Sequence, residues 1–143
     1  MSLTTFPNGV AVRSVEITSA GVEIGAVTVT DAGLVGGAQL PTQVISVAGP
    51  TAITLKSGLV LLTRTGGAAA ATLAAPDAGD NGKILHILAT TAQAHTVTIA
   101  NGLSGAGAAA DVGTFGGAVA DRVSLVAYDG KWFPLLNTNV TFA

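Results

Sequence analysis

Two histidines are the first candidates for chemistry in this sequence, because imidazole is a general base and a metal ligand near neutral pH. His86 and His95 both fall inside apolar segments with the character of strands. No serine of the chain stands in a Gly-x-Ser-x-Gly nucleophile motif. We therefore expect both histidines to be buried or interfacial hydrogen-bonding residues. The alternative is an ion site, formed where a symmetric trimer gathers three copies of one histidine on its axis.

Paired carboxylates are the second candidates, since they serve glycoside hydrolysis and calcium binding. Asp77 and Asp80 flank Gly79 in a Pro-Asp-Ala-Gly-Asp-Asn-Gly segment. This segment lacks the Asp-x-Asp-x-Asp-Gly register and the closing Glu of a calcium loop, so we expect a turn. Asp111 and Asp121 are interpreted as solvated or intersubunit ion-pair partners. The sequence thus predicts no enzyme and no catalytic, cofactor-binding or metal-binding residues; a glycan-degrading enzyme is the alternative.

Three of the six aromatic residues cluster late in the chain, at Tyr128, Trp132 and Phe133. A tryptophan beside a hairpin either stacks on a sugar or anchors a partner protein. The structural alternative is that these rings close one end of the core. We expect the structural role, and keep Tyr128 and Trp132 as candidates for binding a host glycan.

The composition of the chain is unusually poor in charge. Only 10% of the 143 residues are charged, against roughly 25% in an ordinary soluble domain. The net charge is -2 and the six Lys and Arg are scattered singly, which argues against binding to nucleic acid. The longest uncharged stretches are interrupted by Pro, Gln or His, so no membrane span is expected. A surface with so little charge indicates contact with protein, and self-association first.

Short runs of apolar and β-branched residues, separated by Gly, Asn and Asp turns, predict an all-β chain. The expected strands are 10–18, 22–30, 43–48, 52–55, 59–65, 83–90, 95–100, 122–128 and 131–137. Asp129-Gly130 predicts a two-residue hairpin between the last two strands, and Pro134 predicts a bulge or a sheet edge. The expected fold is a small antiparallel β-barrel or jelly-roll-like sandwich with an extended N-terminal arm.

One expected strand lacks the alternation of a half-buried strand. Leu59-Val60-Leu61-Leu62 is apolar at every position, so both of its faces need to be covered. In a small barrel or sandwich, the second face is covered only by the arm or by another subunit. We therefore place Leu59, Leu61 and Leu62 at an interface with another copy of the chain, together with the interfacial candidate His95.

A change in composition divides the chain into two parts. Residues 33–41 are rich in Gly and end in a Pro, which is typical of a linker or a long crossing loop. We expect residues 1–41 to form an arm with a hairpin-like unit, and residues 42–143 to form a barrel-like or jelly-roll-like body that self-associates.

Several motifs of the body, in their order, resemble a β-rich module of virion proteins from tailed bacteriophages. They include Ala-His-Thr-Val-Thr-Ile at 94–99, Thr-Phe-Gly-Gly at 114–117 and Tyr-Asp-Gly-Lys-Trp at 128–132. The resemblance covers residues 56–133. The opening Thr-Phe-Pro-Asn-Gly-Val at 5–10 also resembles the start of small phage structural proteins, among them capsid decoration (cement) and head-fibre proteins.

The resemblance implies a homotrimer on the outer surface of a phage head, where it binds the major capsid protein and stabilises the shell. It implies no cofactor, nucleic acid or membrane, and assembly in the host cytoplasm. The capsid-contacting residues are expected in the arm, at Phe6, Pro7, Asn8 and Gly9. Similar modules form the tips of tail fibres, so a glycan-binding head-fibre or tail-fibre tip is the alternative. The short arm before the module favours capsid decoration.

Overall fold

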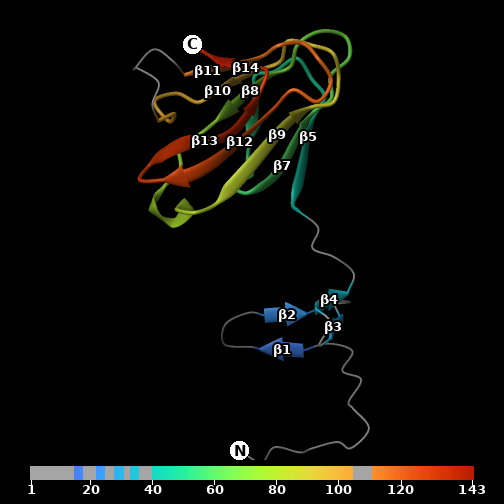
Figure 1. Cartoon of the computed structure of the whole chain (residues 1–143), viewed down its shortest axis with the longest axis vertical. Coiled ribbons are helices and arrows are strands. Elements are labelled where there is room, and N and C mark those ends of the chain that lie inside the picture. The colour runs from blue at the N-terminus through green and yellow to red at the C-terminus, as the bar shows by residue number, and fades with distance from the viewer. Residues whose placement is uncertain (1–14, 18–21, 25–27, 31–32, 36–39, 105–110) are drawn as a thin grey trace, which may run out of the picture. The chain divides into compact units, whose positions relative to one another are not determined.

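The computed structural model describes residues 15–17, 22–24, 28–30, 33–35, 40–104 and 111–143 (Figure 1). The chain divides into two compact units, Met1–Gln39 and Leu40–Ala143, called here the N-terminal unit and the body. The N-terminal unit has two antiparallel pairs of short strands. They are β1 (Val15–Ile17) with β2 (Val22–Ile24), and β3 (Thr28–Thr30) with β4 (Gly33–Val35). Phe6, Pro7, Asn8 and Gly9 lie outside the described residues.

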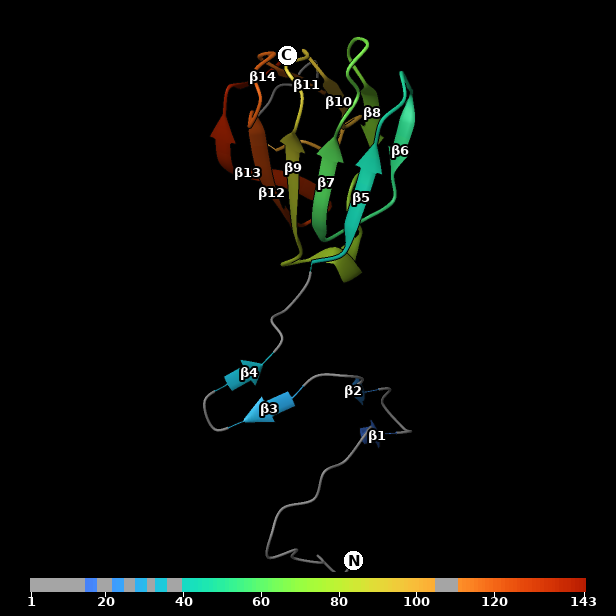
Figure 2. The same cartoon turned by 90° about the vertical axis from the view of Figure 1, so that its right-hand side faces the viewer.

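The body consists of two five-stranded sheets that face each other (Figure 2). The front sheet has the order β13-β12-β9-β7-β5. Its strands are β5 (Thr42–Ile45), β7 (Gly58–Leu62), β9 (Ile84–Ala89), β12 (Arg122–Tyr128) and β13 (Lys131–Thr138). The back sheet has the order β14-β11-β10-β8-β6. Its strands are β6 (Thr51–Ile53), β8 (Ala70–Leu73), β10 (Thr96–Thr98), β11 (Val112–Phe115) and β14 (Val140–Phe142).

The chain winds between the two sheets before it reverses. From β5 to β10, successive strands alternate between the front and back sheets, so that β5, β7 and β9 run parallel, as do β6, β8 and β10. The strands from β11 to β14 then complete both sheets with antiparallel pairs. Each sheet is therefore mixed, with three parallel strands on one side.

The all-β prediction is confirmed, but the predictions of a barrel and of purely antiparallel strands are wrong. The sheets are not closed on each other by backbone ladders, because β5, β13, β6 and β14 remain as edges. Side-chain amides bridge these edges instead. Gln43 donates to Ala52 O at 2.8 Å and accepts from Thr54 N, while Asn137 Nδ2 donates to Val140 O at 2.7 Å. The jelly-roll order is not confirmed, since successive strands wind between sheets.

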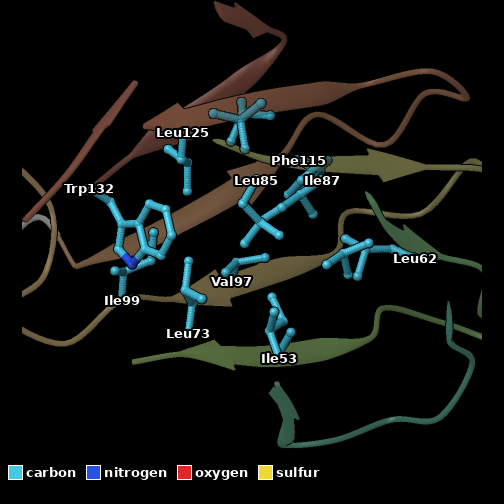
Figure 3. Packing of buried hydrophobic residues seen from close by; sticks show 14 of the residues in the cluster. Ile53, Leu62, Leu73, Leu85, Ile87, Val97, Ile99, Phe115, Leu125 and Trp132 are labelled. Carbon is cyan, nitrogen blue, oxygen red and sulfur yellow. The ribbon is translucent and has the colours of Figure 1, made fainter. Parts of the chain in front are cut away.

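The core lies between the two sheets (Figure 3). The alternation of each strand turns one row of side chains inward, where front-sheet Leu85, Ile87 and Leu125 meet back-sheet Val97 and Phe115. All five are at most 2% exposed. Burial of a large apolar side chain stabilises a fold by about 1.5–3 kcal/mol, so this layer holds the sheets together.

The last hairpin forms as predicted. Tyr128 pairs with Lys131, and the two turn residues Asp129 and Gly130 both have positive φ, which is the requirement of a type I′ turn. The register then shifts between Leu125, which pairs with Pro134, and Ser124. The predicted bulge and sheet edge at Pro134 are thus both present, since β13 is an edge strand. The bulge places a proline where no ladder bond is needed.

Candidate interaction surface

The outward side of the front sheet is an almost continuous apolar surface, called here the apolar face. Its residues come from all five strands and stand in cross-strand register. Between the charged ends they are Thr42, Val44, Leu59, Leu61, Ile84, His86, Leu88, Ser124, Val126, Tyr128, Phe133, Leu136 and Thr138. One row of register partners runs Val44, Leu61, Leu88. Val44, Ile84, Tyr128 and Leu136 are between 41% and 62% exposed.

The strand β7 shows how this face arises. Its residues alternate in burial: Val60 and Leu62 are fully enclosed in the core, while Leu59 and Leu61 are half-buried on the outer side. The uninterrupted run of leucine and valine therefore places apolar side chains both in the core and on the outer side of the sheet, as in a strand that is covered on both sides. Leu62 and His95 have no exposed surface, so Leu59 and Leu61 are the predicted interface residues that remain available to a partner.

The outward side of the back sheet has a different character. Its residues are small and mostly hydroxylated, and none is charged: Ala52, Ala70, Thr72, Thr96, Thr98, Val112, Thr114 and Thr141. A threonine on a sheet surface can hydrogen-bond to water while its methyl group packs against neighbours. This threonine face therefore tolerates solvent, whereas the apolar face does not to the same degree.

Charge is confined to the ends of the apolar face. Arg122 stands at one end of β12, and Lys131 at the opposite end, at the start of β13; both are exposed. The middle holds one polar pair, in which His86 Nδ1 lies 2.8 Å from Ser124 Oγ. An apolar centre with a charged rim is the usual anatomy of a protein interface.

The aromatic cluster divides between the core and the surface. Trp132 is 0% exposed, and its indole N–H donates to Ala74 O at 2.9 Å. Tyr128 is 62% exposed and meets Phe133 edge to face, with 6.2 Å between ring centroids. Trp132 therefore closes the core and is not available to a sugar, while Tyr128 and Phe133 form an open aromatic pair at the hairpin end of the apolar face.

His95 is a structural hydrogen-bonding residue with a defined tautomer. Its Nδ1 accepts from Ala69 N at 2.9 Å, so the proton of the neutral ring is on Nε2. Nε2 lies 2.9 Å from Thr91 Oγ1, which gives its own proton to Arg64 O at 2.7 Å. Burial, together with the charge of Arg64, lowers the pKa of His95. The ring thus connects three segments of the body as a neutral group.

The carboxylates weighed for chemistry serve turns. Asp77 caps the short 3-10 helix η1 (Ala78–Asp80), with its Oδ1 accepting from Gly79 N at 2.8 Å. Asp80 Oδ1 accepts from Lys83 Nζ at 2.7 Å, and this bond, followed by that from Asp77 N, lowers the pKa of Asp80. The Asp80 carboxylate is thus held charged at the start of the strand β9.

Asp121 organises a second turn. Burial alone would raise its pKa, but hydrogen bonds from Ala118 N at 2.9 Å and from Asn139 Nδ2 at 2.9 Å, with those from two glycine amides, outweigh burial and lower it. Asp111 accepts from Asn101 N at 2.9 Å. Within the part of the chain that the structure describes, no group of three or more His, Asp or Glu side chains is placed to hold a metal ion.

Several residues of the apolar face were not singled out from the sequence. Ile84, Leu88, Val126 and Leu136 are among them. The sequence of β9 contains one feature that could have identified two of these residues, Ile84 and Leu88. Residues 84–89 read Ile-Leu-His-Ile-Leu-Ala, so apart from His86 this strand is as uniformly apolar as β7. β9 and β7 are neighbours in the front sheet and both have two apolar faces. Two such strands side by side indicate a sheet that needs to be covered on both sides.

Comparison of the sequence with protein-family models and with curated proteins gave no match. Among the described residues, no helix has the length and apolar character needed to cross a membrane. The motifs that resemble the phage module can be located in the body. His95, Phe115 and Trp132 are core residues, and Asp129-Gly130 forms a turn. These motifs therefore account for folding, and function has to be argued from the surface.

Proposed function

We propose that this chain is a structural virion protein, a homotrimeric decoration protein that binds the outer surface of a tailed-phage capsid and stabilises the shell. The observation that carries the proposal is the apolar face, a large apolar surface that the described residues of the body do not cover. Such a surface is unusual on a protein that functions alone. The charge-poor composition and the resemblance of residues 56–133 to the phage module support the same reading.

The division of the chain supports separate roles for its two units. The body has its own core and an apolar face on the outer side of its front sheet, which suits self-association. The N-terminal unit includes the segment proposed to contact the capsid, with Phe6 as an apolar anchor and Pro7 as a stiffening residue. Three copies of a weak contact on one trimer raise the effective concentration at the capsid surface, so a modest interface suffices for firm attachment.

Cosedimentation with emptied capsids tests this function. The full chain is expected to pellet with capsids and to raise the temperature at which the shell opens. A chain lacking residues 1–40 is expected to keep the fold of the body, which has its own core, and to lose capsid binding. Phe6→Ala in the full chain is expected to weaken binding at least several-fold. If the truncated body bound capsids as strongly as the full chain, the arm would not be the segment that attaches the protein to the capsid.

A head-fibre or tail-fibre tip that binds host glycan is the second candidate, and the open aromatic pair favours it. Tyr128 and Phe133 lie at the end of the apolar face rather than at its centre, so they remain accessible when the centre is covered. Stacking of a sugar on an exposed aromatic ring is a common mode of glycan binding. Tyr128→Ala is expected to abolish binding to host cells or to a glycan array if this function holds, and to leave capsid binding unchanged.

A further inference from the structure

We infer that two side-chain amides, those of Gln43 and Asn137, prevent the edges of the back sheet from pairing with strands of another chain. Each amide takes the backbone hydrogen bonds that a neighbouring strand would otherwise make. The two side chains are called here the amide clasps. The inference concerns which edges of the body are closed to strand addition, and it does not depend on capsid binding.

The edges of the back sheet are positions at which a further strand would add. From β5 to β10 the chain makes three coils, and each coil adds one parallel strand to each sheet. The strands β11 to β14 complete the stack on one side, whereas β5 and β6 are its edge strands on the other (Figure 2). A stack of parallel coils extends by adding another coil, so its ends need caps. A free edge in a charge-poor β protein is also a site for pairing between chains.

Gln43 caps the edge of β6. It lies on the inward side of β5 and is half-buried. Its Nε2 donates to Ala52 O at 2.8 Å, and its Oε1 accepts from Thr54 N at 2.9 Å. In a parallel ladder, one residue of the neighbouring strand makes both of these bonds. The amide therefore takes the place of a strand residue opposite Ile53. Pro50, which precedes β6, offers no N–H to a further strand.

Asn137 has the same role at the edge of β14. It pairs with the core residue Val123 in the ladder of β13 and β12, so it also lies on the inward side of its sheet. Its Nδ2 donates to Val140 O at 2.7 Å, and its Oδ1 accepts from Val140 N at 3.0 Å. Two bonds exchanged with one residue are the pattern of a hydrogen-bonded pair of antiparallel strands. The backbone groups of Val140 are thus already used within the chain.

The amide clasps make the two sheets unequal. Both amides come from edge strands of the front sheet and bind edge strands of the back sheet. A strand that adds to β6 or β14 has to displace two hydrogen bonds before it forms its own, which disfavours pairing there by roughly ten-fold or more. A second copy of this chain is the partner that removal of a clasp admits, because β6 of each copy then offers the same free groups to the other across a twofold axis.

Cysteine cross-linking with and without the Gln43 clasp tests the inference, because the full chain has no native cysteine. Ala52 is an exposed, outward residue of β6, so Ala52→Cys places a thiol beside this edge and keeps the clasp. Under mild oxidation at one fixed protein concentration, Ala52→Cys alone is expected to stay largely unlinked. Gln43→Met with Ala52→Cys is expected to form linked dimers at least about ten-fold faster.

Gln93→Met with Ala52→Cys is the matched control. Gln93 also donates its side-chain amide to a backbone carbonyl, Thr65 O, but it lies outside the strands. This control is expected to link as slowly as Ala52→Cys alone. The edge of β14 gives an independent second test, in which Asn137→Leu is expected to speed linking of Thr141→Cys, an exposed residue of that strand.

Amide hydrogen exchange shows whether each clasp has been removed from a folded chain. Gln43→Met is expected to speed exchange at Thr54 roughly ten-fold and to leave Val140 unchanged, and Asn137→Leu is expected to do the reverse. Slow exchange across β9 shows that the core remains folded.

Faster exchange at Thr54 without any gain in linking of Ala52→Cys would overturn the inference, because the clasp would then only stabilise the fold. Equal linking with and without Gln43 would also overturn it, since the edge would be open in the presence of the clasp. So would an equal gain in linking by Gln93→Met.

Discussion

Truncation of Trp132 gives a direct test of how the body is held together. Trp132 is the only tryptophan of the chain and is 0% exposed. Trp132→Ala removes a ring from a closed core, which costs about 3–5 kcal/mol of unfolding free energy. Trp132→Phe keeps most of the apolar contact but leaves Ala74 O without the indole donor, at a cost of roughly 1–2 kcal/mol.

Equilibrium urea unfolding, followed by far-ultraviolet circular dichroism at one fixed protein concentration, measures both losses. The concentration is held fixed because association adds to apparent stability. Val119→Ala serves as the control, since Val119 is 62% exposed and is expected to change stability by no more than about 0.5 kcal/mol. A Trp132→Ala variant as stable as this control would refute the assignment of Trp132 to the core and restore it as a surface platform for sugar.

Two further predictions concern buried contacts of the body. Protonation of His95 would place a second proton on Nδ1, against Ala69 N–H. Since its folded pKa is lowered, the unfolding free energy is expected to be constant above about pH 6.5 and to fall as the pH drops below it. Urea titrations between pH 7 and 5 measure this slope, and His95→Gln should abolish it; an unchanged slope would contradict the assignment. Gly58 has φ +115°, and a Cβ there would lie 2.3 Å from Pro41 O. Gly58→Ala is expected to cost more than about 2 kcal/mol in the same assay, while Gly66→Ala, with open space around it, should be nearly neutral; equal costs would contradict the close approach.

The winding of the strands illustrates why part of the fold was not predictable from sequence. Register partners in the front sheet are 17 residues apart from Thr42 to Leu59, but 27 apart from Gly58 to Leu85. Unequal loops between the coils leave no repeat period in the sequence. Hairpin chemistry, in contrast, is local, and Asp129-Gly130 therefore predicted its turn correctly.

The interaction surface, too, was predictable from the sequence only in part. The continuous apolar run of β7 indicated a strand covered on both sides, and this inference led to Leu59 and Leu61. Which members of the run point outward depends on the register of the strand against its neighbours. Leu62 was placed at the interface but lies in the core, because β7 alternates and Leu62 shares its inward side with Val60.

The sequence by itself determined the all-β character, the last hairpin with its bulge at Pro134, and the expectation that a charge-poor chain associates with protein. These depend on local backbone preference and on composition, which neighbours in space do not alter. Only the tertiary structure decided that the sheets are mixed, that His95 lies in the core and not at an interface, that Tyr128 is exposed while Trp132 is enclosed, and that one outer face is apolar and the other rich in threonine. These depend on which distant strands pair and in which register, because a shift of one residue exchanges the inner and outer faces of a strand.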